Sequence, residues 1–106
     1  MNPDFAFESA GEGRFTMRGE LSFNTVPRIS VSVGDQLWKT DSVVLDLDGI
    51  TRTDSAGLAL LIEWIRSARQ KNRKIVFHNM PEQMMVMARV VGLDRILPTD
   101  ETYKSG

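Results

Sequence analysis

Two aspartates follow an apolar run in the segment VVLDLDGI, residues 43–50. This Asp-x-Asp-Gly spacing suits a phosphatase in which one carboxylate attacks phosphorus and the other is a general acid beside Mg²⁺. However, Ile50 replaces the threonine of such sites, and the 56 residues after it contain no pair of adjacent aspartates. A short motif without its structural context is weak evidence. We therefore expect no catalytic residues, and we interpret Asp46 as a strand-end residue and Asp48-Gly49 as a turn.

The composition excludes most other kinds of catalytic and metal-binding site. The chain has no cysteine and one histidine, His78, which excludes disulfides, thiolate metal sites, iron–sulfur clusters and sites with several histidines. Thirteen Lys and Arg against fourteen Asp and Glu give a formal net charge of −1, so nucleic-acid binding through overall charge is not expected. We expect neither a metal nor a cofactor.

The polar segment Thr53-Asp54-Ser55-Ala56-Gly57 is the strongest candidate for a binding site. It lies between an apolar run and a predicted helix, and the free N–H groups at a helix start attract negative charge. A phosphate on Ser55 would be tolerated there, and the small Ala56 and Gly57 would let another protein approach the backbone. Asp and Ser are also common at helix starts for capping alone. Spacing by itself favours capping, and both interpretations stay open.

The charged and apolar runs indicate which segments face solvent and whether any segment could enter a membrane. Five of the nine residues from Arg66 to Lys74 are basic, which we interpret as a solvated helix end whose cations suit the helix dipole. The longest purely apolar run, Leu58–Ile62, is far too short to cross a bilayer. Residues 1–13 contain no basic residue and no apolar stretch, unlike a signal peptide. We therefore expect a cytoplasmic domain that does not insert into a membrane.

The first third of the chain has the pattern of a hairpin followed by a helix. Polar and apolar residues alternate over 5–7 and 14–21, and a glycine-rich turn at 11–13 joins the two strands. Residues 23–38 are ambiguous, since 29–33 alternate with the period of a strand. The length of this segment favours a helix.

The middle of the chain predicts two strands separated by a helix. The near-continuous apolar runs 43–47 and 74–78 are typical of strands buried on both faces. A polar loop is expected over 48–57. The helix between the strands begins at Asp54 or Ser55 and carries an apolar stripe.

A last helix follows the second of these strands. Asn79 with Glu82 three residues later resembles a capping box. Met84 and Met87 share the apolar stripe of this helix and are expected in the core. Met85 falls off that stripe and is expected to be exposed.

The order of these elements predicts an α/β fold. Two strand–helix–strand crossovers require a parallel sheet core, with the hairpin at one side. We predict a single domain over residues 1–106, with a mixed sheet of four to five strands, an N-terminal hairpin and three to four helices. The core is expected over about 14–97, and residues 98–106 are expected to form a flexible tail.

Three spaced motifs resemble the STAS domain family, which includes anti-sigma-factor antagonists and the cytoplasmic modules of sulfate transporters. Residues 54–57 (DSAG) fill the family's D-[ST]-[SGA]-G loop, and 92–96 (GLDRI) fill its late G-L-x-x-[IVL] motif. Residues 18–21 (RGEL) resemble its early G-[ED]-[LI] strand end. The resemblance implies a STAS-like domain and a helix over residues 24–38.

Within that family, GELSFNTVP and DSAGLALLIEW most resemble the STAS subunits of Mla-type ABC phospholipid transporters. This resemblance implies a non-catalytic subunit that binds the cytoplasmic ATPase (MlaF-like) of a complex with a membrane permease, peripheral at the inner membrane. It implies contacts through Thr53, Asp54, Ser55, Ala56 and Gly57. The alternative is an anti-sigma-factor antagonist that a kinase regulates at Ser55, although such antagonists commonly have a second serine where this chain has Ala56.

Overall fold

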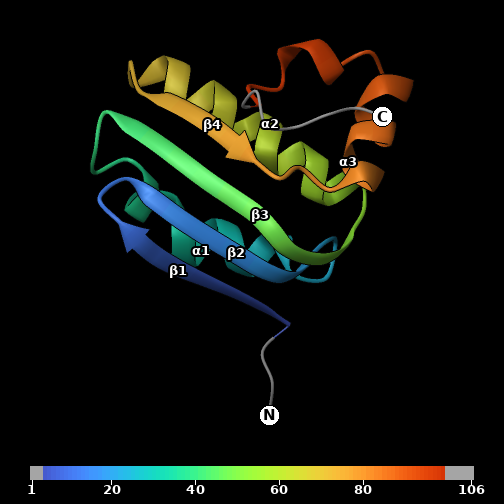
Figure 1. Cartoon of the computed structure of the whole chain (residues 1–106), viewed down its shortest axis with the longest axis horizontal. Helices are drawn as coiled ribbons and strands as arrows, with labels where there is room; N and C mark the ends of the chain where they lie inside the picture. The colour runs from blue at the N-terminus through green and yellow to red at the C-terminus, as the bar shows by residue number, and fades with distance from the viewer. Residues whose placement is uncertain (1–3, 100–106) are drawn as a thin grey trace.

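A mixed four-stranded sheet carries the fold (Figure 1). The computed structural model describes residues 4–99. In chain order, its elements are β1 (Phe5–Gly11), β2 (Arg14–Leu21), α1 (Val26–Leu37), β3 (Ser42–Thr53), α2 (Ser55–Gln70), β4 (Lys74–His78), α3 (Glu82–Val90) and the short 3₁₀ helix η1 (Asp94–Ile96). The strands lie in the order β1-β2-β3-β4, with β1 antiparallel to β2 and the other neighbours parallel. The predicted α/β fold with an N-terminal hairpin is confirmed.

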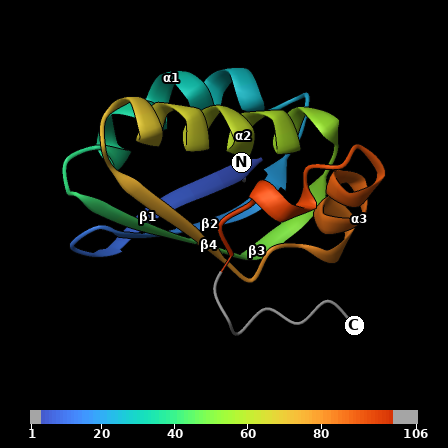
Figure 2. The ribbon, with the colours of Figure 1, turned by 90° about the horizontal axis from the view of Figure 1, so that it is seen from above.

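Both crossover helices cover the same face of the sheet (Figure 2). α1 connects β2 to β3, and α2 connects β3 to β4, so the chain crosses the sheet in one direction. Because parallel crossovers are almost always right-handed, two successive ones in the same direction place their helices on the same side. Among the described residues, no helix covers the opposite face.

This one-sided cover corrects the expectation that the strands over residues 43–47 and 74–78 are buried on both faces. In β3, Val43, Leu45 and Leu47 are buried, whereas Val44 and Asp46 between them are partly exposed. β4 repeats the same alternation. The apolar residues at outward positions made these strands look fully buried in the sequence.

The predicted polar loop over residues 48–57 is wrong except at Asp54, because β3 continues through Thr53 and α2 begins at Ser55. The end of β2 provides the pairing partner, with Leu21 opposite Thr53. Backbone pairing to a neighbouring strand outweighs the local turn preference of Asp48-Gly49, and no turn forms there.

α1 confirms the helical interpretation of residues 23–38. Ile29, Val33 and Leu37 are buried at helical spacing, whereas Val31 is 88% exposed. The apparent strand period came from Val31, a residue on the solvent face of the helix.

Two expectations about the C-terminal helix are wrong. Met85 is buried beside Met84 rather than exposed, because α3 packs against both α2 and η1. Asn79 does not cap α3, since Pro81 occupies the N-cap position. Instead Asn79 adopts a positive φ of 56° and its amide donates to a carboxylate oxygen of Asp46 at 2.9 Å.

The start of the predicted tail is docked on the sheet. The N–H of Phe77 donates to the carbonyl of Pro98 at 2.8 Å, and Thr99 forms a parallel bridge with Phe77. The rest of that tail, residues 100–106, lies outside the described residues.

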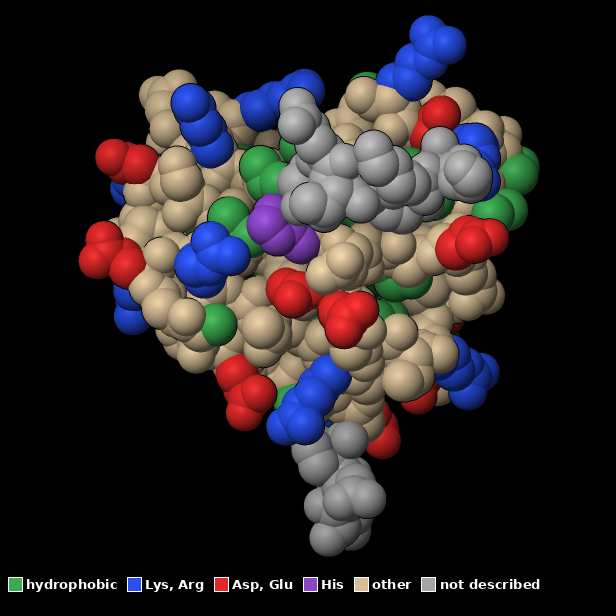
Figure 3. Space-filling model, viewed as in Figure 1, with side chains coloured by type: hydrophobic (Ala, Val, Ile, Leu, Met, Phe, Trp, Pro, Cys, Tyr) green, Lys and Arg blue, Asp and Glu red, His purple; other side chains and the backbone are tan. Residues whose placement is uncertain are grey.

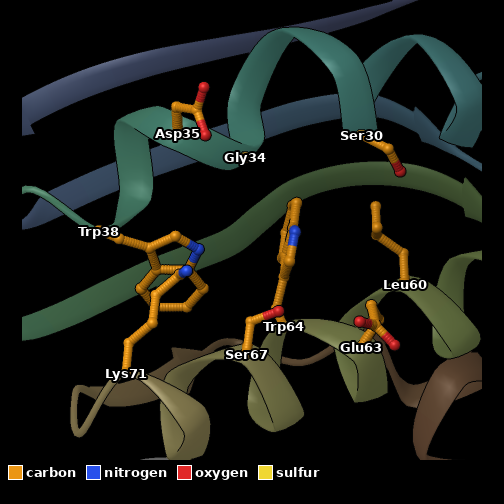
Figure 4. A pocket seen from close by; sticks show the side chains of 9 residues that line it. All are labelled: Ser30, Gly34, Asp35, Trp38, Leu60, Glu63, Trp64, Ser67 and Lys71. Atoms are coloured by element: carbon orange, nitrogen blue, oxygen red, sulfur yellow. The ribbon is translucent and has the colours of Figure 1, made fainter.

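α1 and α2 leave a groove of about 270 Å³ between them (Figure 4). Trp38 at the end of α1 and Trp64 in α2 line it, together with Lys71. Gly34 faces open space in this region, because no atom lies within 4 Å of the position that a Cβ would take. The missing side chain of Gly34 therefore contributes to this hollow.

Candidate functional site

The ends of β2 and β3 bring two connections together at one edge of the sheet. Parallel neighbouring strands end at the same edge, and Leu21 and Thr53 are paired at these ends. Residues 22–25 connect β2 to α1, and the single residue Asp54 connects β3 to α2. Figure 1 shows both connections at the same end of the sheet. The predicted site therefore lies beside the β2–α1 loop.

The carboxylate of Asp54 joins these two connections. Its Oδ1 accepts hydrogen bonds from the N–H groups of Ala56 at 2.9 Å and Gly57 at 3.3 Å, which makes Asp54 the N-cap of α2. Both carboxylate oxygens also accept from the N–H of Phe23, at 3.2 and 3.0 Å. One side chain thus starts α2 and holds the β2–α1 loop against it.

These donors keep the pKa of Asp54 below its ordinary value. The largest cause is the hydrogen bond from the N–H of Phe23, and the bonds from Gly57 and Ala56 act in the same direction, while burial opposes them. The positive charge of Arg52 adds a smaller lowering. The first turn of α2 therefore keeps a charged carboxylate at neutral pH, where the helix dipole favours it.

A second network shapes the β2–α1 loop from within. The hydroxyl of Ser22 and the side-chain amide of Asn24 donate to one carboxylate oxygen of Glu20, at 2.6 and 3.2 Å. These two bonds, that of Ser22 first, lower the pKa of Glu20. The buried Thr25 is the N-cap of α1, but its hydroxyl donates to the backbone carbonyl of Glu20 instead of capping the helix. The loop is thus held by side chains on both of its ends.

The five predicted site residues divide into outer and inner ones. Ser55 is exposed, and Asp54 and Ala56 are partly exposed. Thr53 is only 4% exposed, and Gly57 is buried so tightly that a Cβ there would lie 2.3 Å from a backbone oxygen of β2. The small size of Gly57 therefore serves the packing of α2 on the sheet, and not the approach of another protein to this backbone.

Phe23 belongs to this surface, and sequence reasoning missed it. Its side chain is 77% exposed, although aromatic residues usually bury most of their area. Its N–H bond to Asp54 keeps it next to the start of α2. The available signal was a lone aromatic in the polar stretch SFNT, where neither a strand nor a helix pattern accounts for it.

Asp46, the first aspartate of the phosphatase-like motif, has structural partners. Its Oδ1 accepts from the N–H of Asp48 and from the amide of Asn79, both at 2.9 Å. Figure 3 views the sheet face that no described helix covers, and charged side chains of both signs are spread over it. Within residues 4–99, no group of three or more His, Asp or Glu side chains is placed to hold a metal. In the same range, no helix is long and apolar enough to cross a membrane.

Comparison with known families identifies this arrangement as a STAS domain. Residues 5–98 match the family model described as "Mlab, STAS domain". The chain belongs to this family of MlaB-like STAS domains. A search of curated protein sequences gives no match.

Solved structures share the fold at low sequence identity. The anti-sigma factor antagonist SpoIIAA in its unphosphorylated form gives a TM-score of 0.68 at 16% identity, over 91% of this chain and 87% of that one. The Bacillus cell fate determinant SpoIIAA in its phosphorylated form gives 0.66 at 17%, over 91% and 90%. An anti-sigma factor antagonist from Mycobacterium paratuberculosis gives 0.69 at 17%, over 94% and 89%. At such identities these similarities show the common fold alone.

The double role of Asp54 predicts a pH-dependent stability defect in Asp54→Ala. Loss of the cap should lower the free energy of unfolding by about 1–2 kcal/mol at neutral pH. Because the folded-state pKa is depressed, the contribution of the carboxylate is complete above the unfolded-state pKa and is lost as pH falls through the folded-state pKa. Urea denaturation of both proteins should therefore give curves that converge in acid.

Asp35→Ala is the matched control, since Asp35 is an exposed aspartate within α1. It should change stability by less than about 0.5 kcal/mol. A difference between Asp54→Ala and the unchanged protein that stays constant down to strongly acidic pH would contradict the assigned role.

Two glycine substitutions should have opposite effects on thermal stability. Gly57→Ala places a Cβ against a backbone oxygen of β2 and should cost about 1–3 kcal/mol. Gly34→Ala adds a Cβ in open space within α1 and should stabilise by about 0.5–1 kcal/mol. Thermal melts should show a lowered Tm for the first and a raised Tm for the second, and equal tolerance at both positions would refute the tight docking of α2.

Proposed function

We propose that this chain is a non-catalytic STAS subunit that binds the MlaF-like ATPase of an Mla-type ABC phospholipid transporter. The contact is made by the docking surface, which we define as Phe23, Asp54, Ser55 and Ala56. One observation carries the proposal: a single carboxylate, that of Asp54, holds an exposed hydroxyl and an exposed aromatic ring on one rigid support. Membership of the MlaB-like family supports this choice of partner.

The docking surface combines the two kinds of contact that protein interfaces favour. The ring of Phe23 offers apolar area that a partner pocket can bury, and such aromatic anchors often carry much of the binding energy. The hydroxyl of Ser55 can both donate and accept hydrogen bonds, and it lies on the first residue of α2, exposed to solvent. Since the backbone that carries both groups is held in place before binding, little backbone conformational entropy is lost when a partner docks.

This function does not require a membrane anchor, and no helix within residues 4–99 is long and apolar enough to be one. The ATPase would hold the subunit at the cytoplasmic side of the inner membrane, where the permease of the complex lies. In this arrangement the subunit contacts protein and not the transported lipid.

A second candidate function uses the same hydroxyl. In an anti-sigma-factor antagonist, a kinase would phosphorylate Ser55, and the exposed position of this side chain at the start of α2 is compatible with that role. The match to the MlaB-like family favours the hypothesis of a transporter subunit over this alternative.

The proposed contact predicts that Ser55→Arg prevents complex formation. A long cationic side chain at the centre of the docking surface should weaken binding by about 2 kcal/mol or more, roughly thirtyfold in Kd. Co-expression with a tagged ATPase subunit encoded beside it, followed by co-purification, measures the loss. Circular dichroism should show an unchanged fold, because Ser55 is exposed.

Gln70→Arg serves as the control, since Gln70 is an exposed residue at the other end of the same helix. The two positions are fifteen residues apart in sequence, which corresponds to about 22 Å of helix. We expect the control to co-purify normally. If Ser55→Arg also co-purifies in full yield, the ATPase does not use this surface.

The exposed ring of Phe23 predicts a separate loss of affinity. Phe23→Ala should weaken ATPase binding by more than about 1 kcal/mol while leaving stability nearly unchanged, because the ring is not part of the core. Val31→Ala removes a comparably exposed apolar side chain on α1 and should have no effect on binding. Equal affinities of the two variants, measured by biolayer interferometry, would remove Phe23 from the docking surface.

A further inference from the structure

A second hollow lies on the opposite side of α2 from the groove of Figure 4. It has a volume of about 300 Å³ and lies between the second half of α2, the outer edge of β4 and the segment around Pro98. We call it the β4-edge pocket. Its apolar lining includes Ile65, Ile75, Ile96 and Pro98.

The hollow exists because the edge of β4 is only partly covered. The segment after η1 pairs with β4 at Phe77, where Pro98 accepts the backbone hydrogen bond and Thr99 forms the bridge. The preceding residues of the strand, Lys74 to Val76, instead form part of the pocket wall. The pocket is therefore the uncovered remainder of a sheet edge.

The charged residues of the pocket are all cationic. Arg69, Arg73 and Lys74 line it, and no carboxylate is among its lining residues. Asp41, an exposed residue, forms an ion pair with Arg73 and offsets part of this charge. At least two cations thus remain beside an apolar surface.

The basic run noted in the sequence is divided by the fold. Arg66 pairs with Glu63 on the surface of α2, and Lys71 lines the groove between α1 and α2. The other three basic residues of that run line the β4-edge pocket. The helix dipole accounts for cations at the end of α2, but it does not account for their arrangement around an apolar hollow.

Arg73, which lines the pocket, carries one unsatisfied donor. Its Nε is buried and has no hydrogen-bond partner in the structure. An unsatisfied buried donor costs free energy, and hydrogen bonds from guanidinium to an anionic oxygen are among the strongest in proteins. An anionic group bound in the pocket would reach the exposed part of the Arg73 guanidinium, and it would meet the buried Nε only after this side chain turns.

We propose that the β4-edge pocket binds a small amphiphilic anion, a short aliphatic chain that carries a carboxylate or a phosphate. The anionic head would bind Arg69, Arg73 and Lys74, and the chain would lie against the isoleucines of the lining. The volume is at the low end of ligand pockets, which suits a single short chain. The pocket is concave, whereas binding to a bilayer surface uses cations that face outward together.

This site is separate from the docking surface. Ser55 and Arg69 are fourteen residues apart on α2, which corresponds to about 21 Å along the helix. The inference does not depend on the identity of the protein partner, and it can fail while the proposed function stands.

Octanoate is a suitable probe for the full chain in solution. Titration followed by ¹H–¹⁵N NMR should give saturable shifts at the amides of Ile65, Ile75 and Val76. Acetate, which lacks the chain, and octanol, which lacks the charge, should not give saturable shifts at these amides. Saturation by octanol equal to that by octanoate would overturn the role of the cations.

Two exposed positions allow the pocket to be changed without loss of the core. Lys74→Glu and Ile96→Asp should each weaken octanoate binding roughly tenfold or more, because each places a carboxylate in the pocket lining. Lys71→Glu and Val90→Asp are matched controls outside the pocket, and both should bind octanoate as the unchanged protein does. Equal weakening by Lys74→Glu and Lys71→Glu would indicate attraction to general charge and would refute a built site.

A vesicle-binding experiment distinguishes binding of a free ligand from binding to a lipid surface. Co-sedimentation with vesicles that contain phosphatidylglycerol should show no binding that depends on Lys74. Vesicle binding that Lys74→Glu abolishes, together with no saturable response to octanoate, would replace the proposed ligand site by a membrane contact.

Discussion

The hydrogen bonds of the Asp54 carboxylate are the constraint on which the proposed docking surface depends. Two of its partners are N–H groups of the first turn of α2, and the third is the N–H of Phe23 in a different connection. Parallel pairing of β2 with β3 brings these two connections to the same edge of the sheet. The carboxylate then fixes how they face each other, and this decides which side chains reach solvent together. A cap that satisfied only its own helix would leave the loop that carries Phe23 without this support.

The direction in which the chain crosses the sheet has a second consequence for function. Both crossover helices lie on one face (Figure 2), so the core forms between α1, α2 and that face. At the docking surface, α2 starts almost directly from the sheet, because only Asp54 separates it from β3. The tight contact at Gly57 keeps this start close to β2. A surface supported in this way is expected to change little on binding, which suits the proposed contact with a partner protein.

The sequence predicted the order of the elements better than their surroundings. Buried positions at helical spacing in α1 and α2, and the turn at residues 11–13, follow from local patterns, and the fold class follows from element order. The extension of β3 through Thr53 depends on a partner strand more than thirty residues earlier, which no local pattern contains. Met85 is likewise buried on a helix that packs against α2 and against η1, which lies further along the chain. Long-range contacts, rather than weak propensities, explain these errors.

The candidate site shows the same division between local and long-range information. Asp54 and Ser55 were found from the sequence because capping residues carry a local signature. Phe23 was not found, since its place beside Ser55 depends on a hydrogen bond that spans 31 residues. Likewise, the basic run was found as a group, but only the fold separates Lys71 from Lys74 and places them at different hollows. The helix dipole attracts cations equally on every face of the helix end. It therefore gives no reason for Arg69 and Lys74 to lie beside apolar side chains. The two ends of α2 therefore differ in kind: at its start the backbone and a carboxylate present a hydroxyl, and at its end cations surround an apolar pocket.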